Sequence, residues 1–336
     1  AKLLEYLQDS IEGFGPSMSV EQFKGGQSNP TYKLTTPGAS YVLRRKPPGK
    51  LLKSAHAVDR EFQVISALYE ADFPVARPYV LCEDDSVIGT MFYVMDCVDG
   101  RIFWEPDLPD CATDERYAIY DRMNATIARL HSFDYSALGL ADYGKPGNYF
   151  ARQISRWSKQ YYASETQTIE PMDRLIEWLG ANIPQDESAS IVHGDYRLDN
   201  MIIAPDAPDV TAVLDWELST IGHPLADFTY HLMVWQMPDL GIGSSGLVGR
   251  DCSALNIPDE QTYIDWYCER TGRDGIAERD FYSAFNFFRI AAILQGIAGR
   301  VRDGTAASAH AKSAIHAVTP LAQTGWHYAQ QAGATG

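Results

Sequence analysis

The chain has 336 residues, of which 45% are hydrophobic and 12% are aromatic. This composition supplies ample material for a buried core, and the length is typical of two lobes rather than one. The formal net charge of −16 argues against general binding to nucleic acids or to anionic membranes.

Cysteine content and apolar segments indicate where the protein works. The five cysteines include no CxxC pair, and their odd number predicts a reduced, cytoplasmic protein. No basic segment followed by an apolar run opens the sequence, so we expect no signal peptide. The apolar segment FNFFRIAAILQGIAG (285–299) contains Arg289 and is too short to span a bilayer, so it predicts a buried helix. The sequence gives no expectation for the oligomeric state.

The first 98 residues predict a small α+β unit. Five short runs are rich in β-branched and aromatic residues and are separated by turn-forming residues; they are SVEQF (19–23), PTYKLTT (30–36), SYVLRR (40–45), RPYVLCED (77–84) and TMFYVMDCV (90–98). Between the third and the fourth run, residues 54–71 carry apolar side chains at helical spacing, with Ser54 as a possible cap. We therefore expect a five-stranded sheet with one helix over residues 1–98.

Residues 99–336 predict a mainly helical unit. Helical patterns cover residues 115–133, 148–162 and 171–183, and several more follow between 258 and 330. The only strand-like pieces are NMIIA (200–204) and TAVLDW (211–216), which the turn-forming segment PDAPD separates. These two pieces predict a single hairpin.

Polar side chains concentrate around this hairpin, in IVHGDYRLDNMII (191–203) and at Asp215. A hairpin places Asn200, at the start of its first strand, beside Asp215, at the end of its second, and Asp195 approaches from the preceding loop. Carboxylate and amide oxygens are the ligands that Mg²⁺ prefers. The alternative is a capped loop in which Asp195 and Asn200 bind backbone amides, and the residues alone leave both possibilities open.

The segment HGDYRLDN (193–200) resembles the HGDxxxxN catalytic loop of the aminoglycoside phosphotransferase and choline kinase-like families, which is similar to the protein-kinase loop HRDxxxxN. VLDWE (213–217) then stands where these families have their metal-binding aspartate. The order of elements is also similar over most of the chain. The resemblance implies an α+β, bilobal, protein-kinase-like fold with a nucleotide-binding N-terminal lobe and a catalytic, substrate-binding C-terminal lobe.

The resemblance also implies an activity: an ATP- and Mg²⁺-dependent phosphotransferase that transfers the γ-phosphate to an alcohol group of a small molecule. Asp195 would orient the acceptor hydroxyl and accept its proton, and Asn200 and Asp215 would bind Mg²⁺. Arg197 would contact the γ-phosphate, or would instead pair with Asp199.

Two further residues resemble structural positions of these families. His193 is expected to be structural and to bind a backbone carbonyl near Asp215. Asp227, in GHPLADFTYHL, corresponds to an aspartate that holds the catalytic loop from the start of a helix.

On the nucleotide side, these families have a lysine on the third strand that binds the α- and β-phosphates and pairs with a helix glutamate. Alternation along YVLRRK places Arg44 at the lysine position, and Glu61 would be its partner. Arg44 departs from the family pattern, because its longer, planar guanidinium is not a conservative replacement for the ammonium of a lysine. Lys46, on the same face, could substitute for it.

Two other segments resemble nucleotide-binding elements. Gly25 and Gly26 lie in a loop that would cover the phosphates, although a plain hairpin turn explains them equally. YVMDCVDG (93–100) resembles the hinge, in which Met95 would line the adenine pocket while the C=O of Asp96 and the N–H of Val98 read the base. An aliphatic strand with a methionine is otherwise ordinary core.

Two alternative functions are open. Because the lysine is missing, the chain could be a catalytically inactive, nucleotide-binding kinase-like module. A metal-dependent hydrolase is the other alternative, because several metal-capable residues share helical spacing or lie near one another in sequence; they are His193, Asp195, His223, Asp227 and His231. Pro224 opposes a regular helix around His223, and no HExxH motif is present.

The acceptor is suggested only by resemblance. VLRRKPPGKLLKSAHAVDREF (42–62) and LDWELSTIGHPLADFTYHLMVW (214–235) resemble the subgroup of these families that is associated with acyl-CoA dehydrogenases. This implies a hydroxyacyl-CoA-type acceptor more than an aminoglycoside-like one. In these families, the residues that correspond to 134–190 and 235–300 hold the acceptor.

Overall fold

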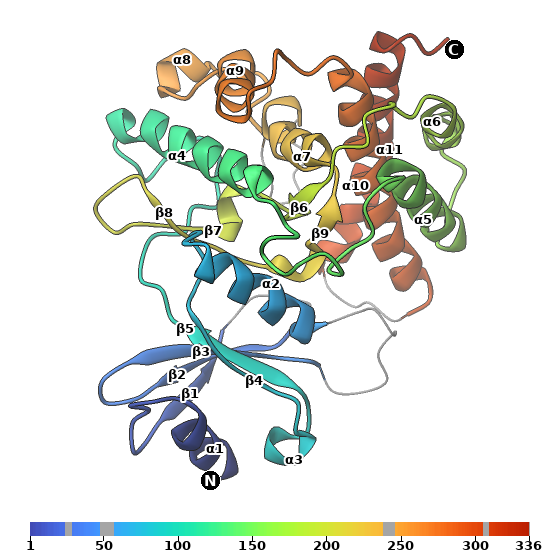
Figure 1. Cartoon of the computed structure of the whole chain (residues 1–336). Coiled ribbons are helices and arrows are strands. Elements are labelled where there is room, and N and C mark those ends of the chain that lie inside the picture. Colours follow the sequence, from blue (N-terminus) through green and yellow to red (C-terminus); the bar gives the residue numbers. More distant parts are fainter. Residues whose placement is uncertain (24–28, 48–56, 238–245, 305–308, 336) are drawn as a thin grey trace. The chain divides into compact units, whose positions relative to one another are not determined.

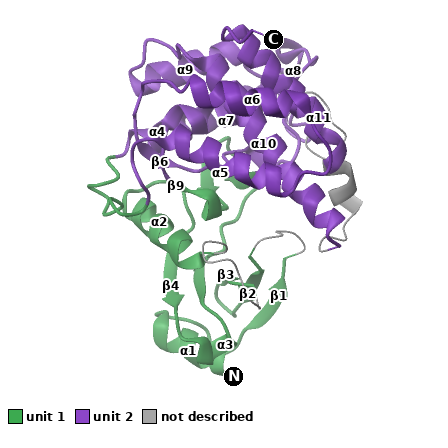
Figure 2. Cartoon of the chain, turned by 90° about the vertical axis from the view of Figure 1, so that its right-hand side faces the viewer, with its two compact units in different colours: residues 1–102, 134–143, 200–219 green, residues 103–133, 144–199, 220–336 purple. Residues whose placement is uncertain are grey.

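The computed structural model describes residues 1–23, 29–47, 57–237, 246–304 and 309–335. The chain divides into two compact units, drawn in green and purple in Figure 2. Unit 1 contains residues 1–102, 134–143 and 200–219; unit 2 contains residues 103–133, 144–199 and 220–336. Each unit is therefore assembled from segments distant in sequence, and the predicted boundary near residue 98 stays a prediction. Gly25, Gly26 and the expected cap Ser54 lie outside the described residues.

Unit 1 is built on the predicted five-stranded antiparallel sheet (Figure 1). In spatial order its strands are β1 (Ser19–Gln22), β2 (Thr31–Thr35), β3 (Ser40–Arg45), β5 (Phe92–Asp96) and β4 (Pro78–Cys82). In the register of β3 against β5, Val42 pairs with Met95 and Arg44 pairs with Tyr93. The central strands bury their middle residues, which anchors Arg44 at the end of a rigid element.

Helix α2 (Val58–Glu70) is the predicted helix of this unit and contacts β4 and β5. Its buried residues recur every three or four positions and include Glu61, a charged residue on an otherwise apolar face. The expectation of a single helix was wrong, because α1 (Lys2–Ser10) and α3 (Asp85–Ile88) are also present. Both are short, with nine residues in α1 and four in α3, and α1 buries only Leu7.

The hairpin of the predicted strands forms as β7 (Met201–Ile203) and β8 (Val210–Val213), with Met201 opposite Val213. It belongs to unit 1, since the N–H of Val213 donates to the C=O of Pro74 at 2.8 Å and Arg101 bridges to Ile203. At Gly100 a Cβ would lie 2.4 Å from the backbone oxygen of Ile203, so a side chain there would prevent this close approach.

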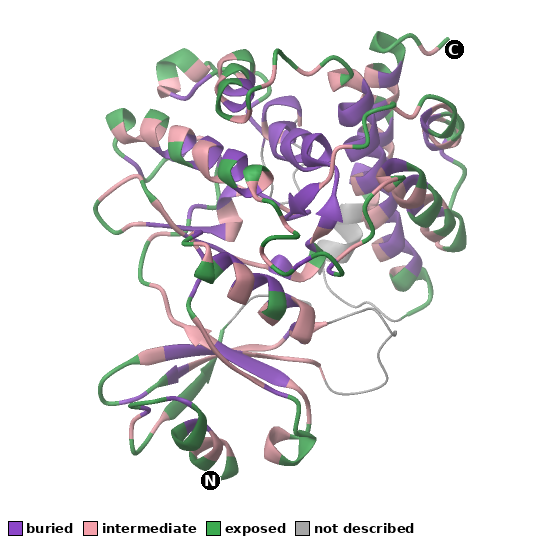
Figure 3. Ribbon diagram, viewed as in Figure 1, coloured by how far each residue is buried: buried purple, intermediate pink, exposed green. Residues whose placement is uncertain are grey.

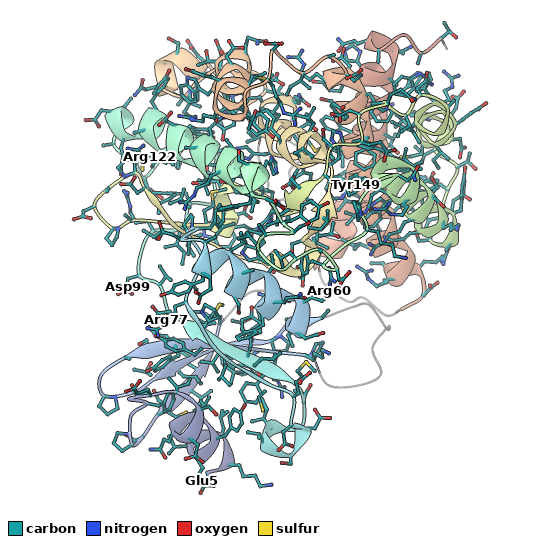
Figure 4. All side chains as sticks on the ribbon, viewed as in Figure 1. Glu5, Arg60, Arg77, Asp99, Arg122 and Tyr149 are labelled. Carbon is teal, nitrogen blue, oxygen red and sulfur yellow. The ribbon has the colours of Figure 1, made fainter. Side chains whose placement is uncertain are left out.

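Residues 134–143 join the same unit through Tyr143. The Tyr143 hydroxyl lies 2.5 Å from the Ser219 hydroxyl. Arg60, labelled in Figure 4 on α2, donates to the C=O of Tyr143 at 2.6 Å, and its guanidinium carbon lies 4.2 Å from the centroid of the Tyr143 ring. These contacts tie α2 to the segment that follows the hairpin.

Unit 2 is mostly helical, as predicted. Its helices are α4 (Thr113–Ser132), α5 (Tyr149–Ala163), α6 (Glu170–Ala181), α7 (Pro224–Gln236), α8 (Cys252–Leu255), α9 (Glu260–Thr271), α10 (Arg279–Arg302) and α11 (Ala309–Gln331). The sequence missed one strand pair, in which β6 (Ser190–Val192) runs antiparallel to β9 (Thr220–Gly222). Each of these strands has three residues, too few to show an alternating pattern.

Helices α7 and α10 form the core of unit 2, and Figure 3 shows buried residues around most of their surfaces. Helix α10 extends beyond the apolar segment that predicted it. By length and composition it could cross a membrane, but 78% of its most apolar window is buried inside the molecule. The predicted buried helix is therefore present, and it carries the buried Arg289.

Candidate active site

The loop that follows β6 carries Asp195 and is held by the first turn of α7. The backbone N–H groups of His193 and Gly194 donate to the carboxylate of Asp227, at 2.7 and 2.8 Å. Burial by itself raises the pKa of Asp227, but the His131 hydrogen bond and charge and the backbone donors outweigh burial and lower it. The helix N-terminus also favours a negative charge here. Asp227 thus holds the loop, in the position that the sequence suggested.

The carboxylate of Asp195 contacts Tyr230 and Arg197, both in unit 2. Its Oδ1 accepts a hydrogen bond from the Tyr230 hydroxyl at 2.5 Å and lies 3.3 Å from Nε of Arg197. Burial by itself raises the pKa of Asp195, but the charge of Arg197 and the hydrogen bond of Tyr230 outweigh it, so the pKa lies below its usual range. The side chain is 23% exposed, so a solute can reach this ionised group.

Arg197 combines the two contacts that the sequence left open. Its Nη2 donates to Oδ2 of Asp199 at 2.8 Å, which is the alternative pairing, while its Nε lies next to Asp195. The guanidinium side chain is 41% exposed. A contact of Arg197 with a γ-phosphate stays a prediction.

His193 and Arg289 hold the loop from inside the unit. His193 is fully buried, and its Nδ1 lies 3.2 Å from the donating N–H of Asp195, a contact that the sequence did not predict but that fits a structural role. Arg289 of α10 donates from Nη2 to the C=O of Gly194 at 2.6 Å. With Asp227, these residues fix the backbone on both sides of Gly194.

In unit 1, Arg44 forms an ion pair with Glu61, the partner that the resemblance implied. Nε of Arg44 lies 2.8 Å from Oε2 of Glu61, as an ion pair without hydrogen-bond alignment. The same carboxylate accepts hydrogen bonds from Asn29 at 2.7 Å and from the Tyr93 hydroxyl at 3.1 Å. Burial raises the pKa of Glu61 to about 7, although the positive charge of Arg44 opposes this shift.

The guanidinium of Arg44 also reaches the carboxylates after β8. Its Nη2 lies 2.5 Å from Oδ1 of Asp215 and 3.6 Å from Oε2 of Glu217. An ammonium has no fork with which to contact both Glu61 and Asp215 in this way, so the arginine makes contacts that a lysine at this position would not make. Lys46 lies instead 3.5 Å from Asp59.

The predicted magnesium ligands Asn200 and Asp215 are adjacent in unit 1. The N–H of Leu214 donates to the C=O of Asn200 at 2.8 Å, which joins the two ends of the hairpin. Asp215 has a left-handed backbone, with φ of 63°, and its side chain is 36% exposed. An amide and a carboxylate oxygen at the accessible end of a hairpin fit the chemistry of Mg²⁺, although Arg44 contacts one oxygen of Asp215.

The residues of the hydrolase alternative have other contacts. Nδ1 of His223 accepts from the N–H of Leu225 at the start of α7, and Asp227 holds the loop that carries Asp195. His231 contacts the C=O of Tyr196 at 3.1 Å and the hydroxyl of Tyr263 at 2.7 Å. In the described part of the chain, no three His, Cys, Asp or Glu side chains are placed to hold a metal together. The structure gives this alternative no support.

The hinge residues lie at the end of β5. Met95 pairs with Val42 in the sheet and is partly exposed, as are Asp96 and Val98. The N–H of Asp96 donates to the C=O of Arg77 at 2.8 Å. Their contacts with a nucleotide stay predictions.

Several residues of these two clusters were missed by the sequence analysis. Tyr230 follows Asp227 by three positions, and this helical spacing could have indicated a second contact from α7 to the loop. Asn29, Tyr93 and Arg289 gave no comparable signal, because they come from distant segments and only the fold brings them to their partners.

Comparisons with known proteins show which family and which fold this chain shares. The model of a family described as "Phosphotransferase enzyme family" matches residues 19–261. The crystal structure of a candidate aminoglycoside phosphotransferase from Ralstonia eutropha JMP134 is 53% identical, with a TM-score of 0.91 over 98% of each chain. A thermostable mutant of aminoglycoside phosphotransferase APH(4)-Ia, in a ternary complex with AMP-PNP and hygromycin B, has the same fold, with 13% identity and a TM-score of 0.63 over the whole of both chains.

Two curated relatives are longer proteins. Mouse acyl-CoA dehydrogenase family member 10 is 44% identical over 99% of this chain and 32% of its own length. Mouse acyl-CoA dehydrogenase family member 11 is 42% identical over 95% of this chain and 42% of its own length. The chain thus spans between a third and about two fifths of these relatives.

Proposed function

The chain belongs to the phosphotransferase enzyme family, and on that premise we propose that it is an ATP- and Mg²⁺-dependent kinase of a small-molecule alcohol. The observation that supports the proposal most is Asp195, an ionised, accessible carboxylate in a loop that is held on both sides. A structural neighbour of the same fold binds AMP-PNP and a small-molecule antibiotic together, which supports ATP as the phosphoryl donor.

The chemical step requires little covalent participation from the protein. The acceptor oxygen attacks the γ-phosphorus, the bond to the β-phosphate oxygen breaks, and ADP leaves. Asp195 orients the attacking hydroxyl and takes its proton, a role that typically contributes about 10²–10⁴-fold to the rate. The low pKa of this carboxylate keeps it ionised at neutral pH.

The residues of unit 1 would bind the nucleotide. Asn200 and Asp215 would hold Mg²⁺, which when bound neutralises phosphate charge. Arg44 would contact the α- and β-phosphates as the family lysine does, and its planar fork is suited to phosphate oxygens. Glu61, with its donors Asn29 and Tyr93, keeps the guanidinium in place.

We further propose that the acceptor is a hydroxyacyl-CoA-type molecule and not an aminoglycoside. The names of the curated relatives connect this sequence with acyl-CoA chemistry. The proposal covers the activity of this chain only, since the relatives extend well beyond it.

A basic surface on α5 supports an anionic acceptor. Arg152, Arg156 and Lys159 line one hollow, and none of them has a carboxylate partner in the part of the chain that the structure describes. Helix α5 contains no Asp or Glu, although acidic residues outnumber basic ones 44 to 28 in the whole chain. Phosphate groups of a CoA thioester would be attracted to this surface, and a polycationic aminoglycoside would be repelled.

ATP turnover against a panel of acceptors tests the proposed function. The panel contains hydroxyacyl-CoAs, aminoglycosides, choline and sugars, and ³¹P NMR identifies the phosphorylated product. We expect ADP release that depends on a hydroxyacyl-CoA. ATP binding without turnover on any acceptor would favour the inactive module, and turnover on an aminoglycoside alone would contradict the acceptor class.

A charge reversal on α5 tests the acceptor class separately. Arg156→Glu should raise the KM for the hydroxyacyl-CoA by about tenfold, because a charge-assisted contact is lost and a repulsive one is added. Arg122→Glu is the matched control, since Arg122 is 51% exposed on α4, well apart from the start of α5 at Tyr149 in the same unit (Figure 4). Equal KM values in the two variants would remove α5 from the acceptor site.

A further inference from the structure

Tyr230 touches the carboxylate to which the proposed function assigns the proton. Its hydroxyl donates to Oδ1 of Asp195 at 2.5 Å, and only 8% of the residue is exposed. A phenol that donates to a carboxylate over so short a distance makes a charge-assisted hydrogen bond, which is stronger than a neutral one. Such a bond limits the rotation of the carboxylate about its χ2 angle.

The ring of Tyr230 is itself fixed. Tyr230 lies one turn after Asp227 on the same face of α7, and Asp227 accepts from the backbone of His193 and Gly194. The guanidinium carbon of Arg289 lies 5.1 Å from the centroid of the Tyr230 ring, while Nη2 of Arg289 donates to the C=O of Gly194. Helix α7 therefore holds the loop at two points. Asp227 binds the backbone of the loop, and Tyr230 binds the side chain of Asp195.

We propose that Tyr230 is a positioning residue of the phosphotransfer reaction, which orients the Asp195 carboxylate toward the acceptor hydroxyl. The role rests on the proposed function, in which Asp195 accepts the proton. Tyr230 does not itself take part in the proton transfer, because its own hydroxyl proton is already shared with Oδ1 and burial beside Asp195 raises the pKa of the phenol.

The hydrogen bond also affects the charge of Asp195. The titratable and charged groups around this carboxylate are Arg197 and His193 of its own loop, Tyr230 of α7 and Arg289 of α10. Donation from Tyr230 stabilises the ionised carboxylate, so its removal raises the pKa of Asp195. The acidic limb of the profile of kcat/KM against pH then moves to higher pH.

The test compares the wild type with Tyr230→Phe, which keeps the ring beside Arg289 and removes only the hydroxyl. We expect kcat to fall about ten- to a hundredfold with little change in the KM for ATP, because a misplaced catalytic group slows the chemical step. We also expect the acidic limb to move to higher pH. In Asp195→Asn, the additional Tyr230→Phe change should have little further effect, because the tyrosine acts through the carboxylate.

Tyr120→Phe is the matched control, since Tyr120 of α4 also has a buried hydroxyl, which donates to the C=O of Pro106 at 2.6 Å. It should leave the pH profile unchanged. A second measurement follows the carboxyl ¹³C signal of Asp195 against pH in the wild type and in Tyr230→Phe, with the signal assigned by its loss in Asp195→Asn. This measurement needs no turnover, so a protein without kinase activity would overturn the proposed function while the NMR result still decides on Tyr230.

Three results would overturn the proposal. An unchanged pKa of Asp195 in Tyr230→Phe would show that the hydrogen bond does not act on the carboxylate. Fully additive losses in the double variant would show that Tyr230 acts elsewhere. A lower acceptor KM with unchanged kcat would show that the phenol merely occupies the place of the acceptor hydroxyl and must be displaced.

Discussion

Two carboxylates of the candidate site that each lie next to an arginine, Asp195 in unit 2 and Glu61 in unit 1, have opposite properties. Asp195 is 23% exposed, and its neighbours keep its pKa below the usual range. Glu61 is 1% exposed, and burial raises its pKa to about 7 although Arg44 is closer to it than Arg197 is to Asp195. Burial raises the pKa of both carboxyls, so their neighbours make the difference: Arg197, Tyr230, His193 and Arg289 together outweigh burial at Asp195, whereas the negative charges of Asp215 and Glu217 add to it at Glu61.

The difference matches two different tasks. A proton acceptor must be accessible and ionised, and Asp195 is held by groups that favour its charge. An anchor for the arginine that we propose to bind the nucleotide needs no access to solvent, and Glu61 is enclosed by Asn29, Tyr93 and Arg44. Substitutions in the two clusters should therefore separate chemistry from nucleotide binding.

The largest effect is expected from Asp195→Asn. The amide keeps the shape and an oxygen that accepts hydrogen bonds, but it cannot take a proton. With a confirmed acceptor, turnover should fall by about 10²–10⁴-fold, while calorimetry should show little change in ATP affinity. Rates near those of the wild type would mean that the proton goes elsewhere, and the assignment of Asp195 would be wrong.

Arg44→Ala should act on the other side of the comparison and weaken ATP binding or turnover by about ten- to a hundredfold, because a charge-assisted phosphate contact is lost. Arg45→Ala is the matched control, since Arg45 lies on the opposite face of the strand, 5.7 Å from the centroid of the Tyr32 ring. Arg44→Lys should cause an intermediate loss of ATP binding or turnover. Its ammonium keeps the positive charge but lacks the planar fork with which Arg44 contacts both Glu61 and Asp215. A larger loss in Arg45→Ala or in Lys46→Ala would reverse the assignment.

Asp215→Ala should remove most of the dependence of ATP affinity on Mg²⁺. In the wild type we expect ATP to bind about tenfold or more tightly with Mg²⁺ than without it, since the cation neutralises phosphate charge beside Asp215. Calorimetry in magnesium and in EDTA measures this ratio for both proteins. If both proteins bind ATP equally well in the two buffers, Asp215 is not a metal ligand.

The five strands, the hairpin and the buried late helix could be predicted from sequence, because each has an apolar pattern or a turn signal of its own. Short elements could not: β6 and β9 have three residues each and pair with one another across distant parts of the sequence. The family resemblance, together with alternation along β3, assigned Arg44 to the lysine position and Glu61 as its partner.

The rest of the two clusters depends on distant contacts. Arg44 reaches Asp215 across 171 positions of the chain, and Arg289 reaches Gly194 across 95, so no spacing rule could have indicated these pairs. The contact from Tyr230 to Asp195 spans 35 positions, but it follows from the place of Asp227 one turn earlier on α7. Local patterns therefore identified the residues of both clusters better than they identified their partners.

The smallest expected effect concerns the stability of unit 1 and tests the raised pKa of Glu61. In the unfolded chain this carboxyl has a pKa near 4.5, and in the folded protein near 7, so the folded state binds the proton more tightly. Its contribution to stability is therefore fully present below pH 4.5 and is lost as the pH rises through 7. Glu61→Gln has no such group, so the free energy of unfolding of the wild type should fall by roughly 1–3 kcal/mol relative to that of this variant between pH 5 and pH 8.

Denaturant unfolding of both proteins at the two pH values, without nucleotide, measures this difference. The other titrating groups are common to both proteins, so their contributions cancel. A difference that does not change with pH would mean that Arg44 keeps Glu61 ionised throughout, and the two carboxylates of the comparison would then be alike.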